Sequence, residues 1–138
     1  MNEQGIRGNV LVVEDDVDCG QMMMRILTAA GYGVRLSTSR ELAVHALGRY
    51  LYEYIILDLR MPGMSTEEFL NVVRKSSREM HIILTTAEND APHESLRLGI
   101  EKFIGKPFSP EQLVNTIQSL SSGVRKRPPL PPLSTELD

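Results

Sequence analysis

Five polar residues that are far apart in the sequence each stand at the end of a short apolar run. Glu14 and Asp15 follow VLVV, Asp58 follows YIIL, Thr86 lies in LTTAEND, and Lys106 lies in FIGKPF. Three carboxylates, one hydroxyl and one ammonium form a set of hard oxygen ligands with one cation. Such oxygen ligands suit Mg²⁺, which binds through one or two carboxylates and keeps several of its waters.

A carboxylate beside a bound Mg²⁺ can attack phosphorus and form an aspartyl phosphate. Asp58 is the best nucleophile candidate because it stands alone at the end of a central run. Asp15 would bind the metal directly, and Glu14 directly or through water. Lys106 and the Thr86 hydroxyl would bind phosphoryl oxygens. Without metal, we expect like charge to raise the pKa values of the crowded carboxylates.

The runs before these residues read as buried strands, and amphipathic segments that read as helices lie between them. This βα alternation predicts an α/β protein with a parallel sheet covered on both faces. Right-handed crossovers would then bring the carboxyl ends of all strands to one edge, where the five polar residues would meet. The predicted strands are 10–13, 34–37, 54–57, 81–85 and 102–104, and the predicted helices are 17–30, about 40–49, 65 or 66–75, a short helix from Pro92 to near Gly99, and 110–120.

Four motifs in order resemble the receiver domain of bacterial two-component response regulators. They are VLVVEDD, YIILDLRMPGM, ILTTA and FIGKPF, and the resemblance covers residues 7–121. It implies a doubly wound, flavodoxin-like (βα)5 fold with strand order 2-1-3-4-5. It also implies that Asp58 accepts a phosphoryl group, in the presence of Mg²⁺, from a phosphohistidine on a sensor histidine kinase or phosphotransfer protein.

The resemblance assigns further roles. The metal would be bound by Glu14, Asp15, Asp58 and the main-chain carbonyl of Arg60, and the Lys106–Pro107 bond would be cis. Thr86 and Phe103 would act as the switch pair. The signal would appear on the face formed by the fourth helix, fifth strand and fifth helix, about 91–120, where a partner, a fused output module or a second copy could bind.

The chain departs from the family pattern at several positions. Ser65 and Thr66 replace the usual Asp-Gly, which puts the entry into the third helix in question, and Phe103 replaces a frequent tyrosine. Arg60 and Glu88 occupy two variable positions that tune the lifetime of the phosphoryl group in the family. We hypothesise that their opposite charges form a lid over the site.

Composition excludes several other classes of function. The 138 residues carry a net charge of −3, few aromatic residues and no tryptophan, which gives no footprint for nucleic acid. A single cysteine, Cys19, fits a reducing compartment, and the sequence has no signal peptide and no apolar run of membrane-spanning length. We therefore predict a cytoplasmic protein without a membrane partner.

Two features of the chain allow simpler interpretations. Asp16 and Asp18 fit a solvated loop, and either one could cap the first helix. Residues 122–138 are rich in proline and carry PPLPP, which predicts a flexible tail or linker, with an SH3-type ligand as the less favoured interpretation.

Three functions remain open from the sequence. The favoured one is a phosphorylation-dependent signalling switch, whose only catalysis is uptake and loss of its own phosphoryl group. A Mg²⁺-dependent phosphatase or phosphotransferase with an aspartate nucleophile is the second, although such enzymes carry an acid two residues after the nucleophile, where this chain has Arg60. The third is a pseudo-receiver that binds partners without phosphorylation.

Overall fold

Strands and helices alternate along the whole described chain. The structure is a computed structural model that describes residues 5–76, 79–87, 89–100 and 102–120. The strands are β1 (Asn9–Val13), β2 (Gly33–Ser37), β3 (Tyr54–Asp58), β4 (His81–Ala87) and β5 (Lys102–Lys106). The helices are α1 (Val17–Ala29), α2 (Arg40–Leu47), α3 (Thr66–Lys75), α4 (Ala91–Leu98) and α5 (Pro110–Gln118).

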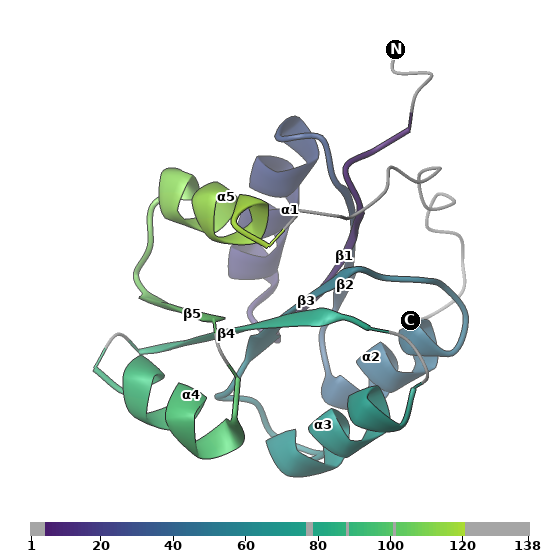
Figure 1. Cartoon of the computed structure of the whole chain (residues 1–138), viewed down its shortest axis with the longest axis vertical. Coiled ribbons are helices and arrows are strands. Elements are labelled where there is room, and N and C mark those ends of the chain that lie inside the picture. The colour runs from purple at the N-terminus through teal and green to yellow at the C-terminus, as the bar shows by residue number, and fades with distance from the viewer. Residues whose placement is uncertain (1–4, 77–78, 88, 101, 121–138) are drawn as a thin grey trace.

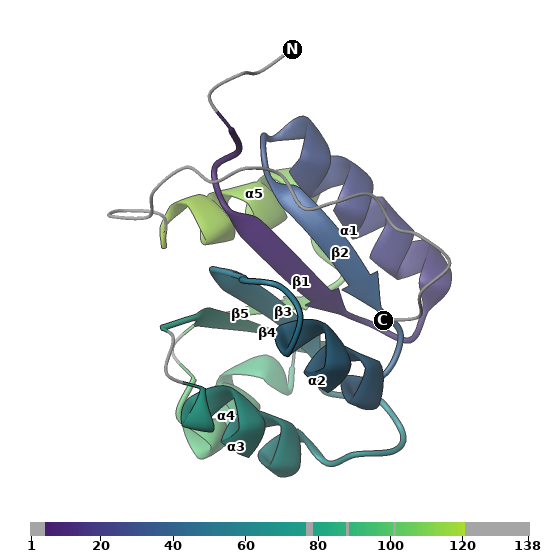
Figure 2. The same cartoon turned by 90° about the vertical axis from the view of Figure 1, so that its right-hand side faces the viewer.

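The five strands form one parallel sheet in the order β2-β1-β3-β4-β5. Helices α1 and α5 cover one face, and α2, α3 and α4 cover the other, so the molecule has three layers (Figures 1 and 2). The predicted doubly wound α/β fold and its strand order are thereby confirmed. All strands point the same way, so their carboxyl ends share one edge of the sheet.

Alternation along the strands divides the core in two, because successive side chains point to opposite faces. Leu11, Ile55, Leu57 and Leu84 pack with residues of α2, α3 and α4. The residues between them pack against α1 and α5. Every residue of β1 and of β3 is buried, which explains why Val10–Val13 and Tyr54–Leu57 are apolar.

Side chains cap four of the five helices. The Asp16 side chain accepts a hydrogen bond from the amide of Cys19, so Asp16 is the cap of α1 and Asp18 lies in its first turn. Ser39 caps α2 in the same manner. Ser65 and Ser109 start α3 and α5 with full capping boxes, in which Glu68 and Gln112 bind back to the cap amides. Thus α3 starts regularly although the usual glycine is replaced.

Several predicted element ends were wrong by a few residues. β4 extends to Ala87 and β5 to Lys106 because the two strands pair as far as Thr86 with Gly105 and Ala87 with Lys106. Thr86 and Lys106 therefore lie within strands. α2 stops at Leu47 and α5 at Gln118, both short of the predicted ends. The predicted tail, 122–138, lies outside the described residues.

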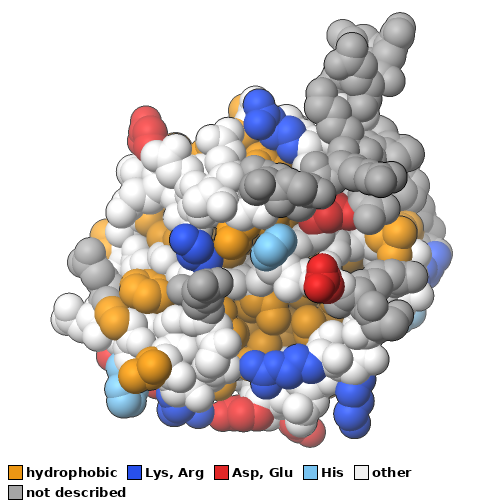
Figure 3. Space-filling model, in the orientation of Figure 1, with side chains coloured by type: hydrophobic (Ala, Val, Ile, Leu, Met, Phe, Trp, Pro, Cys, Tyr) orange, Lys and Arg blue, Asp and Glu red, His pale blue; other side chains and the backbone are white. Residues whose placement is uncertain are grey.

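None of the helices in the described part of the chain is both long enough and apolar enough to cross a bilayer. On the face seen in Figure 3, basic and acidic side chains are interspersed. No strongly basic patch is seen among the residues described on that face.

Substitution of Phe69 tests the packing of α3 against the sheet. Phe69 is fully buried in the core that joins α3 to the sheet, whereas Leu96 on α4 is 83% exposed. We expect Phe69→Ala to lower the free energy of unfolding by about 3–5 kcal/mol, because a large buried ring leaves a cavity. Leu96→Ala is the control and should change it by less than about 0.5 kcal/mol. Urea denaturation followed by circular dichroism measures both, and equal losses would contradict the described packing.

Candidate functional site

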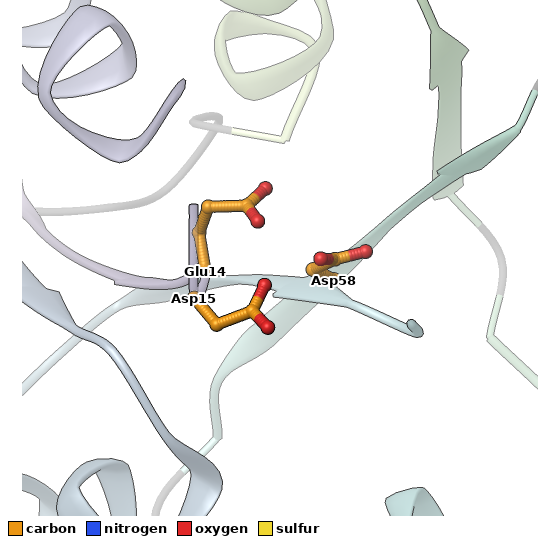
Figure 4. A group of neighbouring side chains, drawn as sticks. All are labelled: Glu14, Asp15 and Asp58. Carbon is orange, nitrogen blue, oxygen red and sulfur yellow. The ribbon is translucent and has the colours of Figure 1, made fainter. Parts of the chain in front are cut away.

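Three carboxylates meet at the carboxyl edge of the sheet. Glu14 and Asp15 follow β1, and Asp58 is the last residue of β3, the strand beside it. One oxygen from each residue lies within 4.8 Å of the other two, and Figure 4 shows the three side chains next to one another. Glu14 and Asp58 are buried, at 1% and 3% exposure, while Asp15 is exposed. The structure thus brings the predicted metal ligands together.

Lys106 reaches this cluster from the end of β5. Its Nζ lies 2.8 Å from Glu14 Oε1, to which it donates a hydrogen bond, and 3.6 Å from Asp58 Oδ1. The Lys106–Pro107 peptide bond is cis, as the resemblance implied. Two main-chain amides complete the contacts of the buried acids, since Asp16 N donates to Glu14 and Arg60 N donates to Asp58, each at 3.2 Å.

The two buried acids differ in their pKa. Burial and the neighbouring Glu14 raise the pKa of Asp58 to about 6. Burial also acts to raise the pKa of Glu14, but hydrogen bonds from Lys106 and the Asp16 amide help to hold it below its usual value. The predicted rise of the carboxylate pKa values is therefore right for Asp58 and wrong for Glu14, because the ammonium binds Glu14 more closely.

Thr86 is buried beside the site, and its Oγ1 has no hydrogen-bond partner among the described residues. Its neighbour Thr85 is also buried, but the two side chains point to opposite faces of β4. Thr86 shares the face of Leu84, and Leu84 pairs with Phe103 on β5. Thr86 and Phe103 therefore lie on one face of adjacent strands, as a switch pair requires. Phe103 is 40% exposed.

Arg60 forms an ion pair above the carboxyl edge of the sheet. Its guanidinium contacts Asp90, the residue before α4, and both side chains are substantially exposed. Glu88, the predicted partner of Arg60, lies outside the described residues. An ion pair does therefore join the loop after β3 to the loop after β4, and Asp90 supplies its acid. The position of Asp90, four residues past Thr86, carried no signal from which its partner could be predicted.

Sequence reasoning also missed Arg40, the first residue of α2. Its side chain is 2% exposed and donates hydrogen bonds to the main-chain carbonyls of Asp58 and Leu59, at 3.1 and 2.9 Å. A charged residue at the start of an amphipathic helix is normally assigned to solvent, so the sequence held no signal for this contact.

Two other features do not contribute to the site. Burial and the charge of Glu14 raise the pKa of Cys19 to about 11, so its thiol is protonated at neutral pH and is no nucleophile. A cavity of about 490 Å³ among the described residues is lined by His81 and Lys102, the first residues of β4 and β5. It therefore lies at the opposite edge of the sheet from the acids.

The arrangement fits a hard divalent cation. Three carboxylates with ligand atoms within 4.8 Å of one another contact one ammonium, that of Lys106, among the residues that the structure describes, so the cluster keeps an excess of negative charge. All of the donor atoms are oxygens, and the grouping contains no histidine or thiolate that would favour zinc. Asp58, the predicted nucleophile, lies within this oxygen cluster, near the Lys106 ammonium and the Thr86 hydroxyl that no described residue binds.

Comparison with known proteins agrees with this geometry. Residues 10–118 match the family model of the response regulator receiver domain. The transcriptional regulatory protein FixJ of Bradyrhizobium diazoefficiens is 29% identical over 115 residues, which are 82% of this chain and 56% of FixJ. The uncharacterized transcriptional regulatory protein YrkP of Bacillus subtilis is 37% identical over 105 residues, 75% of this chain and 45% of YrkP. The chain spans about half the length of these curated relatives.

A solved structure covers nearly the same part of the chain. The chemotaxis response regulator CheY4 of Vibrio cholerae has a TM-score of 0.73 and 31% identity, over 81% of this chain and 97% of that one. The fold and the match to the family model thus indicate one family. The chain belongs to the response regulator receiver domains of two-component systems.

Proposed function

We propose that this chain is a Mg²⁺-dependent phosphoacceptor whose phosphorylation on Asp58 switches a signalling surface. The observation that supports the proposal best is the cluster of Glu14, Asp15 and Asp58 with the Lys106 ammonium 2.8 Å from Glu14 and 3.6 Å from Asp58. The proposed metal ligands are these three carboxylates and the main-chain carbonyl of Arg60. The proposed donor is the phosphohistidine of a sensor histidine kinase or phosphotransfer protein.

In the proposed reaction, a carboxylate oxygen of Asp58 attacks phosphorus, the new O–P bond forms, and the P–N bond to the donor imidazole breaks with its electron pair going to nitrogen. Bound Mg²⁺ supplies positive charge that balances the carboxylates and the phosphoryl oxygens. Lys106, whose Nζ lies 3.6 Å from Asp58 Oδ1, would bind one phosphoryl oxygen. The Arg60 amide, which donates to Asp58, keeps the attacking carboxylate oriented.

The proposed switch uses Thr86 and Phe103. The Thr86 hydroxyl has no partner within the described part of the chain, so it is available to a phosphoryl oxygen. Gly105, which pairs with Thr86, carries no side chain on that face. Movement of Thr86 toward Asp58 would therefore leave room beside Gly105 into which the half-exposed ring of Phe103 can turn. Inward and outward positions of Phe103 would change the surface of α4, β5 and α5.

The partners follow from this surface and from the relatives. FixJ and YrkP bear the names of transcriptional regulators and are about twice as long as the matched segment. We propose that the α4–β5–α5 surface acts on a downstream protein, on a fused output module or on a second copy of the chain. A receiver domain over 7–121 followed by a linker over 122–138, and a cytoplasmic location, are parts of the same proposal.

Asp58→Asn tests the phosphoacceptor. Incubation with Mg²⁺ and acetyl phosphate should add one phosphoryl group to the wild-type chain, as measured by intact mass, and none to Asp58→Asn, because an amide is no nucleophile here. Asp18→Asn is the matched control, since Asp18 is an exposed acid in the first turn of α1, and it should react like the wild type. Turnover of many equivalents of phosphomonoesters would favour the phosphatase instead, and no reaction without loss of folding would favour the pseudo-receiver.

Asp15→Asn tests the metal site. A ligand that binds only the folded state stabilises it, by about 2.7 kcal/mol at a concentration one hundred times Kd. We expect Mg²⁺ to raise the midpoint of thermal unfolding of the wild type and of Asp18→Asn, and to raise that of Asp15→Asn much less. Equal stabilisation of all three chains would mean that Mg²⁺ binds elsewhere.

Arg60→Ala and Glu88→Ala test the lid. An exposed ion pair is worth up to about 1 kcal/mol, which corresponds to about a fivefold change in rate. We expect Arg60→Ala to speed the loss of the phosphoryl group by up to that factor, because the Arg60–Asp90 pair no longer screens the site from water. Arg97→Ala removes a comparable exposed arginine, paired with Glu67 between α3 and α4, and should leave the rate unchanged. The lid hypothesis fails if neither Arg60→Ala nor Glu88→Ala alters the decay measured by mass.

A further inference from the structure

Arg40 binds the segment that carries the phosphoacceptor at four points. Its Nη2 donates to the carbonyls of Asp58 and Leu59, and its Nη1 donates to those of Met61 and Met64, at 3.2 and 2.7 Å. These carbonyls all belong to the end of β3 and the loop that follows. One side chain from α2 thus holds the main chain of 58–64.

This guanidinium is a buried charge without a carboxylate bonded to it. Arg40 is 2% exposed, and it forms no ion pair with any of the residues that the structure describes. Burial of a charge is costly unless its donors are satisfied, and here four carbonyl dipoles satisfy the two Nη groups, while Nε has no partner among the described residues. The planar fork of a guanidinium can reach several carbonyls at once, whereas a lysine ammonium offers three donors from one atom. The contacts therefore require arginine in particular.

Arg40 leaves one main-chain carbonyl of this segment without a hydrogen bond from its guanidinium. Between Asp58 and Met61 the chain has four carbonyls, and Arg40 binds all of them except that of Arg60. This is the carbonyl to which the proposed function assigns the metal. A loop whose neighbouring carbonyls are fixed on both sides has little freedom to turn the remaining one away.

Glu41, the next residue of α2, strengthens the same attachment. Its carboxylate accepts a hydrogen bond from the Met64 amide at 2.9 Å, so Arg40 and Glu41 bind both main-chain groups of Met64. The adjacent Gly63 has a φ of 92°, and a Cβ there would come within 2.9 Å of the Glu41 carboxylate. The loop can approach α2 this closely only because residue 63 is glycine.

We propose that Arg40, assisted by Glu41, is a positioning residue that fixes the 58–64 segment so that the Arg60 carbonyl faces a divalent cation held by Glu14, Asp15 and Asp58. This inference rests on the proposed function, because it concerns the same metal site. It also accounts for the regular start of α3 without the usual Asp-Gly, since Met64, just before the cap Ser65, is held from α2.

Arg40→Lys tests the proposal, because lysine keeps the charge and most of the side-chain volume but cannot reach four carbonyls. Titration of the full chain with Mg²⁺ alone, followed by amide NMR, should show about a tenfold or greater rise in Kd, as is typical when an outer residue that orients metal ligands is lost. Arg35→Met is the control. Arg35 is an equally buried arginine, 3% exposed on β2, and it stacks on Tyr50 at 4.4 Å, away from the 58–64 segment.

We expect Arg35→Met to lower the midpoint of thermal unfolding and to leave the Kd for Mg²⁺ unchanged. Glu41→Ala, on an exposed side chain, keeps the test valid if Arg40→Lys does not fold, and it should weaken Mg²⁺ binding in the same direction. Wild-type Kd values in Arg40→Lys and Glu41→Ala would overturn the role of Arg40 while leaving the proposed function intact. A wild-type chain that binds no Mg²⁺ would overturn both.

Discussion

The structure depends on the burial of two acids at one edge of a parallel sheet. Glu14 and Asp58 are almost fully enclosed, and Asp15 brings a third carboxylate within 4.8 Å of both. Two unit charges at about 4 Å repel by about 4 kcal/mol at the effective dielectric of a protein. Lys106 offsets this repulsion for one acid, which is why the pKa of Glu14 is lowered while that of Asp58 is raised. The remaining negative charge makes the site a place for a further cation.

Pairing between β4 and β5 places Lys106, the ammonium that contacts both buried acids. Lys106 ends β5 opposite Ala87, and Thr86 pairs with Gly105 one step earlier. Both strands extend two residues beyond their predicted ends, because the pairing of β4 with β5 continues past the apolar residues. The pairing of β4 with β5 therefore positions the Lys106 ammonium beside the acids. A strand that ended at Ile104 would leave Lys106 in a loop and its ammonium free to turn toward solvent.

The positions of the strands and of several helix starts could be predicted from the sequence. Buried runs such as Tyr54–Leu57 located the strands, and serines before acidic first turns located helix starts, because both signals are local. Those runs also placed the acids and Lys106 at one edge. Arg40 and Asp90 were missed because each bonds a segment more than fifteen residues away in sequence, and nothing in the residues around them encodes that contact. The lowered pKa of Glu14 was missed for the same reason, since it depends on which acid lies nearest to Lys106.

The site is held on one side and free on the other, and this asymmetry suits a switch. Toward α2, Arg40 fixes the main chain around Asp58 through bonds to its carbonyl and to three that follow. Toward α4, the Thr86 hydroxyl has no partner within the described residues, and Phe103 on the same face is 40% exposed. A group bound at Asp58 would lie between main chain that Arg40 holds by hydrogen bonds and a Thr86 hydroxyl that no described residue binds. In the proposed function, this asymmetry directs the conformational change toward α4 and β5.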